Sequence, residues 1–167
     1  MAPLQHPDLA RLSRVISALR QGETITLPFV PNARGTFSEE FRLGRFHASS
    51  DEDDLLHRVT HRMKSGRETT SRWEPLDWSL DDLMAITADW PAEILDRLPS
   101  LDGIGDAPSY DILRRLDAGE TVVFSGTTLS VAPHTPSEAN ACAIRLVFPS
   151  ETAAAYTAAD LIRYKPR

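Results

Sequence analysis

The chain has 167 residues, which is enough for one domain with a buried core. Apolar residues make up 41% and charged residues 25% of the sequence, a balance that excludes wholesale disorder. No window approaches the roughly 18 to 20 apolar residues that a membrane span needs, and residues 1–21 are charged along their helical pattern, unlike a signal peptide. The sequence therefore predicts a cytoplasmic protein that has no membrane association.

Residue usage indicates a source and a compartment. Cys142 is the only cysteine, so the chain has no internal disulfide, which fits a reducing compartment. All but two of the 18 basic residues are arginines, and this bias, in an alanine-rich chain, indicates a bacterial or phage origin. The net charge of -6 is unevenly distributed, because residues 73–106 carry nine acidic residues and only one basic residue, Arg97. This acidic segment predicts a surface that attracts a basic partner.

Residues 1–72 predict a helix, two strands and a second helix. Asp8 is a candidate cap for the first helix, whose apolar residues recur at helical spacing up to Gly22. Alternation predicts a strand over 24–30, with Pro28 indicating a sheet edge, and a second strand over 41–47. Ser50, the acidic run 51–54 and an apolar stripe then predict a helix over 51–63; the stripe consists of Leu55, Leu56, Val59 and Met63.

The rest of the chain repeats this order after an acidic interval. Residues 65–79 predict a linker with two tryptophans, followed by helices over 80–89 and 91–98. A helix over 110–118, strands over 120–124, 127–131 and 141–148, and a serine-capped helix over 150–164 complete the chain. The Gly-Glu-Thr triplets at 22–24 and 119–121 lie 97 positions apart, which indicates an internal duplication.

The order of elements predicts an α+β fold. Two similar helix-strand-strand-helix halves, residues 1–72 and 107–167, form a mainly antiparallel sheet with helices packed on it. Residues 73–106 form an acidic helical insert between the halves, within one compact domain.

The main functional hypothesis is a non-catalytic binding protein, because no nucleotide-binding, hydrolase or paired-cysteine motif is present. No cofactor is predicted. The partner is a macromolecule, more specifically a protein, bound by an acidic surface framed by tryptophans, since aromatic residues dominate binding hot spots. A homo-oligomer is a further possibility, and core anchoring is the alternative role of the tryptophans. The predicted partner-binding residues are Trp73, Trp78, Asp81, Asp82, Asp89, Trp90 and Glu93.

A second hypothesis is nucleic-acid binding. The stretch 101–113, with its Gly103-Ile104-Gly105 turn and the small residue Ser109 before a helix, resembles the helix-hairpin-helix family. In that family the backbone N–H groups of the turn bind a DNA phosphate, so the resemblance implies a phosphate contact here. A basic run would add further contacts, although a structural turn and neutralisation of the acidic segment are the alternatives. The run consists of Arg58, Arg62, Lys64, Arg67 and Arg72.

A third hypothesis is a metal-dependent enzyme. On the helix predicted over 51–63, Asp54, His57 and His61 are spaced by three and four residues and share one face. A helix can present zinc or iron ligands in this way. The alternative is an ordinary solvent-exposed polar face.

Overall fold

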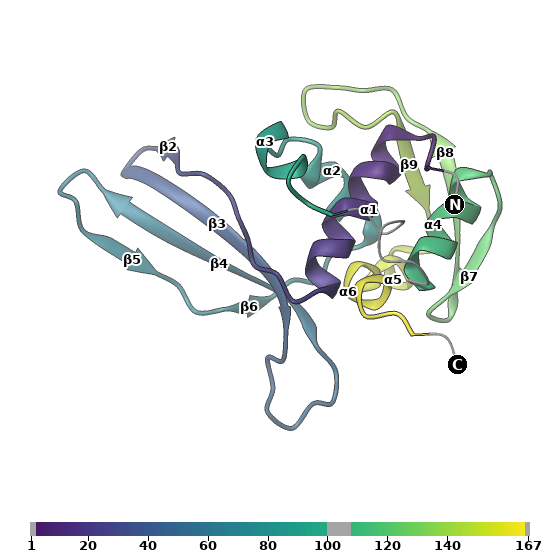
Figure 1. Ribbon diagram of the computed structural model, residues 1–167, viewed down its shortest axis with the longest axis horizontal. Helices are drawn as coiled ribbons and strands as arrows, with labels where there is room; N and C mark the ends of the chain where they lie inside the picture. The colour runs from purple at the N-terminus through teal and green to yellow at the C-terminus, as the bar shows by residue number, and fades with distance from the viewer. Residues whose placement is uncertain (1–2, 100–107, 166–167) are drawn as a thin grey trace.

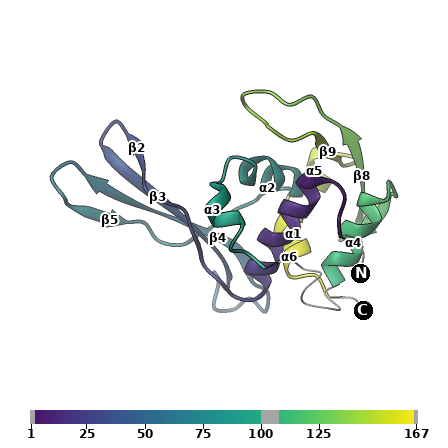
Figure 2. The same ribbon diagram turned by 45° about the horizontal axis from the view of Figure 1, so that its top comes forward.

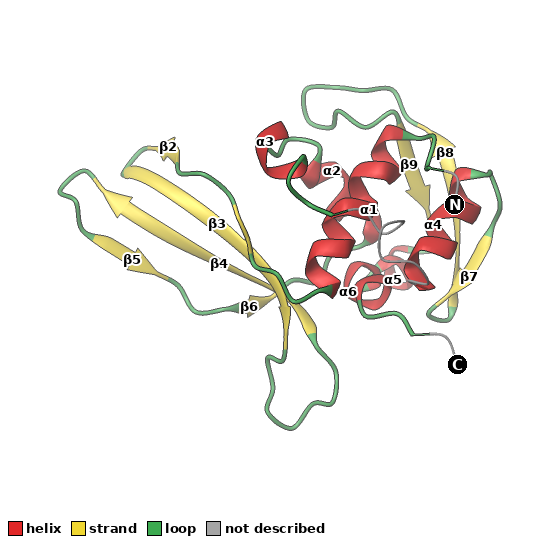
Figure 3. Ribbon diagram, viewed as in Figure 1, coloured by secondary structure: helices red, strands yellow, loops and turns green. Residues whose placement is uncertain are grey.

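The computed structural model describes residues 3–99 and 108–165, and it confirms the α+β class (Figure 1). The strands form two antiparallel sheets, of six and three strands, where the sequence predicted one sheet. Helices and the smaller sheet form a body, from which most of the larger sheet projects (Figures 1 and 3). We call this larger sheet the β-arm.

The helices and the smaller sheet of the body come from both ends of the chain. The smaller sheet has the order β7-β8-β9. The elements of the body are α1 (Pro7–Arg20), α2 (Leu80–Thr87), α3 (Ala92–Leu95), α4 (Pro108–Asp117), β7 (Val122–Phe124), β8 (Thr127–Pro133), β9 (Ile144–Val147), α5 (Glu151–Ala154) and α6 (Thr157–Ile162).

The β-arm is built on a long hairpin of β3 and β4, with two short strands along each edge. On one edge, β1 and β2 pair with β3. The segment 24–30 therefore lies at a sheet edge, as Pro28 indicated, but the predicted strand is interrupted at residues 27–29, which include Pro28. On the other edge, β5 and β6 pair with β4. The strands are β1 (Ile25–Thr26), β2 (Val30–Asn32), β3 (Gly35–Gly44), β4 (Asp54–Met63), β5 (Glu68–Thr70) and β6 (Glu74–Pro75).

The helix predicted over 51–63 is wrong, because this segment forms β4. It pairs with β3 along its whole length, from Gly35 opposite Met63 to Gly44 opposite Asp54. Leu55 and Leu56 are each 1% exposed although they point to opposite faces of the sheet. Burial on both faces hides the alternation typical of a strand, and the remaining pattern matches a helix. The linker predicted over 65–79 likewise contains β5 and β6.

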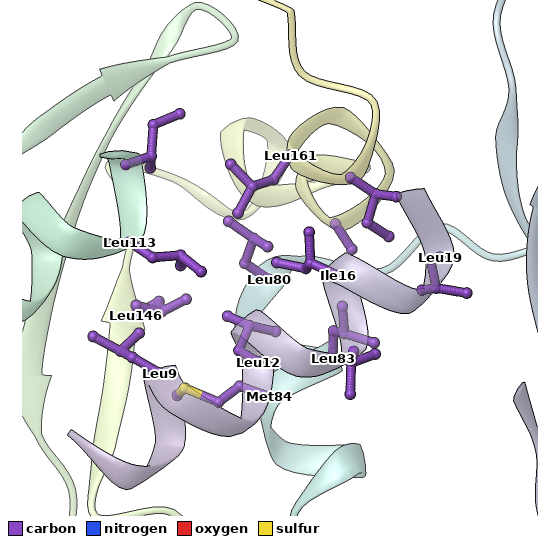
Figure 4. Close-up of a cluster of buried hydrophobic side chains, with 14 of the residues drawn as sticks. Leu9, Leu12, Ile16, Leu19, Leu80, Leu83, Met84, Leu113, Leu146 and Leu161 are labelled. Carbon is purple, nitrogen blue, oxygen red and sulfur yellow. The ribbon is translucent and has the colours of Figure 1, made fainter. Parts of the chain in front are cut away.

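Helix α1 lies at the centre of the hydrophobic core (Figure 4). Its buried side chains pack with leucines of α2, α4, α6 and β9. The acid-rich segment therefore contributes to the common core, because Leu80, Leu83 and Met84 of α2 are at most 1% exposed. Each fully buried leucine stabilises the fold by about 1.5–3 kcal/mol relative to exposure. The leucines and isoleucine of α1 in Figure 4 are Leu9, Leu12, Ile16 and Leu19.

The two Gly-Glu-Thr triplets have the same structure. Gly22 and Gly119 have φ angles of +82° and +85°, a left-handed conformation that glycine adopts without a steric penalty. In each case the next N–H reaches back into the last helical turn, from Glu23 to Ala18 and from Glu120 to Arg115, both at 3.0 Å. This is the Schellman ending of a helix. The predicted cassette of helix, glycine and strand is therefore present in both halves.

The equivalence of the two halves ends after their strands. Ser150 caps α5 as predicted, since its hydroxyl accepts a hydrogen bond of 3.0 Å from the N–H of Ala153. Ser50, at the corresponding place in the first half, lies in the loop before β4 and caps no helix. The predicted final helix is also divided into α5 and α6 at Tyr156, whose φ angle is +67°. The duplication itself stays a prediction.

Each helix within residues 3–99 and 108–165 is too short or too polar to cross a lipid bilayer.

Candidate protein-binding groove at the base of the arm

A groove of about 310 Å³ lies between the β-arm and the α2–α3 region of the body. Three chain segments line it: the β1–β2 edge, the middle of β3, and the end of α2 with the residues that follow. In Figure 2, α3 lies on the side of the body that faces the arm. The lining residues are Leu27, Pro28, Val30, Phe37, Glu39, Ile86, Asp89, Trp90 and Pro91.

An aromatic cluster holds the base of the arm against the body. The ring of Phe41 on β3 lies 5.2 Å from Trp90, 5.7 Å from Trp78 and 4.8 Å from His57, measured between ring centroids. Phe41 and Trp90 are buried, and aromatic pairs at these distances stabilise beyond simple burial. The cluster therefore fixes the position of Trp90, which forms part of the groove wall.

A capping box fixes the start of α2, the helix that leads into the groove. The Ser79 hydroxyl accepts from the N–H of Asp82 at 3.0 Å, and the Asp82 carboxylate accepts from the N–H of Ser79 at 3.1 Å. The helix buries Thr87, whose hydroxyl donates to the carbonyl of Leu83, and leaves Ile86 36% exposed. An exposed isoleucine is thereby directed to the groove.

The groove combines an apolar lining with two carboxylates. Val30 is 41% exposed, so the apolar lining is accessible. Glu39 contacts the ring of His57, with 3.1 Å between Oε1 and Nε2. Asp89 is exposed and forms no ion pair with any residue in the described ranges. The groove therefore offers hydrophobic contact beside negative charge.

The structure places only two of the seven predicted partner-binding residues, Asp89 and Trp90, in the groove. Trp78 belongs to the aromatic cluster, and Asp82 to the capping box. The carboxylate of Asp81 accepts a hydrogen bond of 2.8 Å from the N–H of Leu146, so it joins α2 to β9.

The two remaining residues of the set lie apart from each other. Glu93 is exposed on α3. Trp73 lies on the arm, where the guanidinium groups of Arg42 and Arg58 are each 4.4 Å from its ring centroid. The predicted acidic, tryptophan-framed surface is therefore not one continuous site.

Sequence reasoning missed most of the groove, including Val30, Phe37, Glu39 and Ile86. These residues come from segments that are distant in sequence, and their proximity depends on the packing of the arm against α2. One local signal was available for Ile86. The helical spacing of α2 allows either Ile86 or Thr87 to point inward, and in the structure Thr87 is buried and Ile86 is exposed.

The basic run lies on the arm, on β4 and the segment that follows it. Arg58 pairs with Glu40 on β3 at 2.7 Å, and Arg62 pairs with Glu68 on β5 at 2.7 Å. The arm thus supplies the carboxylates for Arg58 and Arg62. Arg72 pairs with Glu74 of the acidic segment at 3.5 Å, so neutralisation by that segment is seen for this one residue of the run. The Gly103-Ile104-Gly105 turn lies outside the described residues.

The predicted metal-binding face does not exist as a helical face. On strand β4, His57 and His61 point to one side of the sheet and Asp54 points to the other. His57 contacts Glu39 and stacks on Phe41, and no group of three or more His, Cys, Asp or Glu side chains in residues 3–99 and 108–165 is arranged to hold a metal ion.

A larger hollow, of about 1040 Å³, lies where the loop 45–53, the β7–β8 turn and α6 meet. Many of its polar groups are paired with one another. Arg163 and the hydroxyl of Ser125 both bind the carboxylate of Asp160, at 2.6 and 2.7 Å. Arg20 donates to two backbone carbonyls at the end of α6, at 2.8 Å each, and burial lowers its pKa. These contacts hold the loop 45–53, the β7–β8 turn and α6 together. Because these polar groups already bind one another, the groove is the better candidate for a partner.

In comparisons with known proteins, no family model matches the chain, and no match was found among curated proteins or among solved structures.

Proposed function

We propose that this chain is a non-catalytic binding protein that holds a segment of a protein partner in the groove. The partner segment inserts an apolar side chain against Val30 and Ile86 and places a Lys or Arg beside Glu39 and Asp89. The single observation that supports this proposal is the combination of an apolar lining and two carboxylates in one groove. Charge complementarity would favour basic partners and disfavour acidic ones.

The size of the groove favours a small contact. About 310 Å³ lies at the lower end of ligand-site volumes, so one or two side chains would fill it. The neighbouring sheet edge is unsuited to strand addition, because Pro28 and Pro31 have no backbone N–H to donate. Recognition would therefore depend on inserted side chains.

A random peptide library selected against the immobilised full chain tests this proposal. The expected result is enrichment of peptides that carry a large apolar residue close to Lys or Arg. Ile86→Ser should weaken an enriched peptide by about 10-fold, because it removes apolar contact from the groove wall. Asp89→Asn should weaken it about 3- to 10-fold, and this loss should shrink as salt is added.

Two matched control variants distinguish a specific effect of the groove from a general effect of changing a surface residue. Val123→Ser removes an apolar side chain that is 72% exposed on β7, and Glu93→Gln removes an exposed charge near the groove but outside it. Both should leave peptide affinity unchanged. Failure to enrich any such motif, or equal binding by Ile86→Ser and the unsubstituted chain, would refute the proposal.

A further inference from the structure

Positive charge is concentrated on the outer part of the β-arm. We define the distal arm as residues 28–38 and 58–72, which hold six basic residues and one acidic residue. Glu40 and Glu74 lie just outside these ranges and pair with Arg58 and Arg72, and with these two carboxylates included the net charge is +3. Because the whole chain has a charge of -6, the remainder carries -9. The distal arm projects away from the body (Figures 1 and 2). The molecule therefore presents a basic extension on an acidic body.

The register of the strands brings two turns together at the free end of the arm. Gly35 lies opposite both Asn32 on β2 and Met63 on β4, so the β2–β3 turn and the β4–β5 turn are neighbours. Arg34 lies in the first turn; Lys64 and Arg67 lie in the second. All three are exposed, and none forms an ion pair with a residue in the described parts of the chain.

Two further cations are fixed in position on one face of the arm. Arg62 lies 4.0 Å above the ring of Phe29 and is bound by Glu68, while Arg58 is held by Glu40. Alternation on β4 places Thr60 on the same face as the two arginines. Arginines fixed by stacking and ion pairs lose little side-chain entropy when they bind a ligand, and they suit planar recognition of phosphate.

The shape of this surface suits a continuous chain of charges. Residues 58–63 extend about 20 Å along β4, at about 3.3 Å per residue, and the two turns continue the positive charge at the end. A nucleic-acid strand places phosphates about 3.4 Å apart along the helix axis. Several phosphates would therefore lie within reach of the cations on β4 and the two turns. Phe29 is 37% exposed, lies against the guanidinium of Arg62, and offers apolar contact to bases or sugars. The acidic body would repel the same polyanion and leave the arm as the contact region.

We propose that the distal arm binds nucleic acid through its phosphate backbone. The groove is a separate site for a separate partner, because its lining residues Phe37 and Glu39 lie on the face of the sheet opposite Arg58 and Arg62. Arg34, Lys64 and Arg67 do not line it either. The Gly103-Ile104-Gly105 turn is not needed for this interaction.

Fluorescence anisotropy with the full chain tests this proposal. The probes are a fluorescein-labelled DNA single strand and a duplex, each of about 30 nucleotides or base pairs, titrated from about 50 to 200 mM salt. Binding should weaken steeply with salt, and the comparison of the two probes identifies the preferred form. The combined variant Arg34→Ala, Lys64→Ala, Arg67→Ala should raise Kd at least about 10-fold and reduce the salt slope by about 2–3, because three phosphate contacts are lost.

The control variant is Arg97→Ala, Arg145→Ala, Lys165→Ala, which removes the same charge from exposed positions on the body. It should retain most of the affinity and the full salt slope. Ile86→Ser should bind DNA normally, so a failure of the groove proposal would not be mistaken for a failure of this one. Three results would overturn the proposal: no binding at about 50 mM salt, equal losses in the two triple variants, or displacement of DNA by polyglutamate at equal charge. The last would assign the arm to an acidic protein.

Discussion

The carboxylate of Asp8, in the first turn of α1, accepts a hydrogen bond of 2.8 Å from the backbone N–H of Ala143. It also accepts from the N–H of Ile144 at 3.2 Å and pairs with Arg11 at 3.2 Å. Asp8 was predicted to cap α1, but the residue at the N-cap is His6. The side chain instead satisfies backbone groups at the start of β9, and it joins two elements that are more than 130 positions apart in the sequence.

Asp8→Ala should lower the free energy of unfolding by about 2–4 kcal/mol, since it leaves the N–H groups of Ala143 and Ile144 without their acceptor and the partly buried Arg11 without its carboxylate partner. Urea unfolding followed by circular dichroism measures the loss. Asp77→Ala, at an exposed position, should change stability by less than about 0.5 kcal/mol. Equal stability of Asp8→Ala and the unsubstituted chain would contradict this role.

The sequence predicts those parts of the fold in which one chain segment contains its own signal. Helix α1, with an apolar stripe and a terminal glycine, and α5, with a capping serine, are examples of such local information. Strand β4 is the opposite case. Leu55 and Leu56 are both buried because other parts of the molecule cover both faces of the sheet at that point, and no local pattern reports this.

The candidate site was harder to predict for the same reason. The acidic segment was identified as unusual, yet the carboxylates of Asp81 and Asp82 already accept hydrogen bonds from the backbone N–H groups of Leu146 on β9 and of Ser79, the N-cap of α2. Charge counting cannot distinguish such carboxylates from a free one like Asp89. The groove also requires Glu39 of β3 to lie near α2, a contact that exists only after the arm has packed on the body.

Trp73 should hold the outer edge of the arm in place. Its ring stacks with Arg42 and Arg58, and each contact contributes about 0.5–2 kcal/mol. Trp73→Ala should therefore speed hydrogen exchange across residues 68–75, including the N–H of Ser71, which donates to the carbonyl of Val59 at 2.9 Å. The core helices should remain protected.

Trp73→Phe is the control for this change, because a phenyl ring retains part of the cation–π attraction and should give intermediate exchange. Uniformly faster exchange in α1 and β4 would show that Trp73 supports the whole fold and would contradict a local role.

Arg163 should fasten the loop 45–53, which extends below the arm in Figure 1, to the end of α6. Its guanidinium donates to the Asp160 carboxylate at 2.6 Å and to the carbonyl of Asp53, and it lies 3.3 Å from Glu52. Arg163→Ala should lower stability by about 1–2 kcal/mol, since a network with a backbone acceptor exceeds an isolated surface pair. Hydrogen exchange across the loop should also increase.

Salt provides a check on the electrostatic part of this effect. High ionic strength screens the carboxylate pairs of Arg163 but hardly changes the bond to a backbone carbonyl. The stability difference between Arg163→Ala and the unsubstituted chain should therefore shrink in about 1 M NaCl without vanishing. A difference that is independent of salt would assign the effect to packing alone.

Cys142 should make stability depend on pH in the alkaline range. Its thiol is fully buried, and burial raises its pKa, with a further increase from the negative charge of Asp8. The native state therefore keeps the thiol proton to a higher pH than the unfolded chain does. This contribution to stability is complete below the ordinary thiol pKa of about 8.5, and it is lost as pH rises toward the native pKa, by at most about 1.4 kcal/mol per pH unit.

Urea unfolding at a series of pH values between about 7 and 10, a range that includes the ordinary thiol pKa, tests this expectation. Cys142→Ser removes the titrating thiol while the other groups remain, so its stability should fall less steeply over this range. In the native protein a thiol reagent such as dithionitrobenzoate should react slowly, and the reaction should become fast in urea, since reaction requires an exposed thiolate. Parallel pH profiles for the two proteins, or rapid native labelling, would mean that the thiol is accessible and that its burial does not contribute to stability.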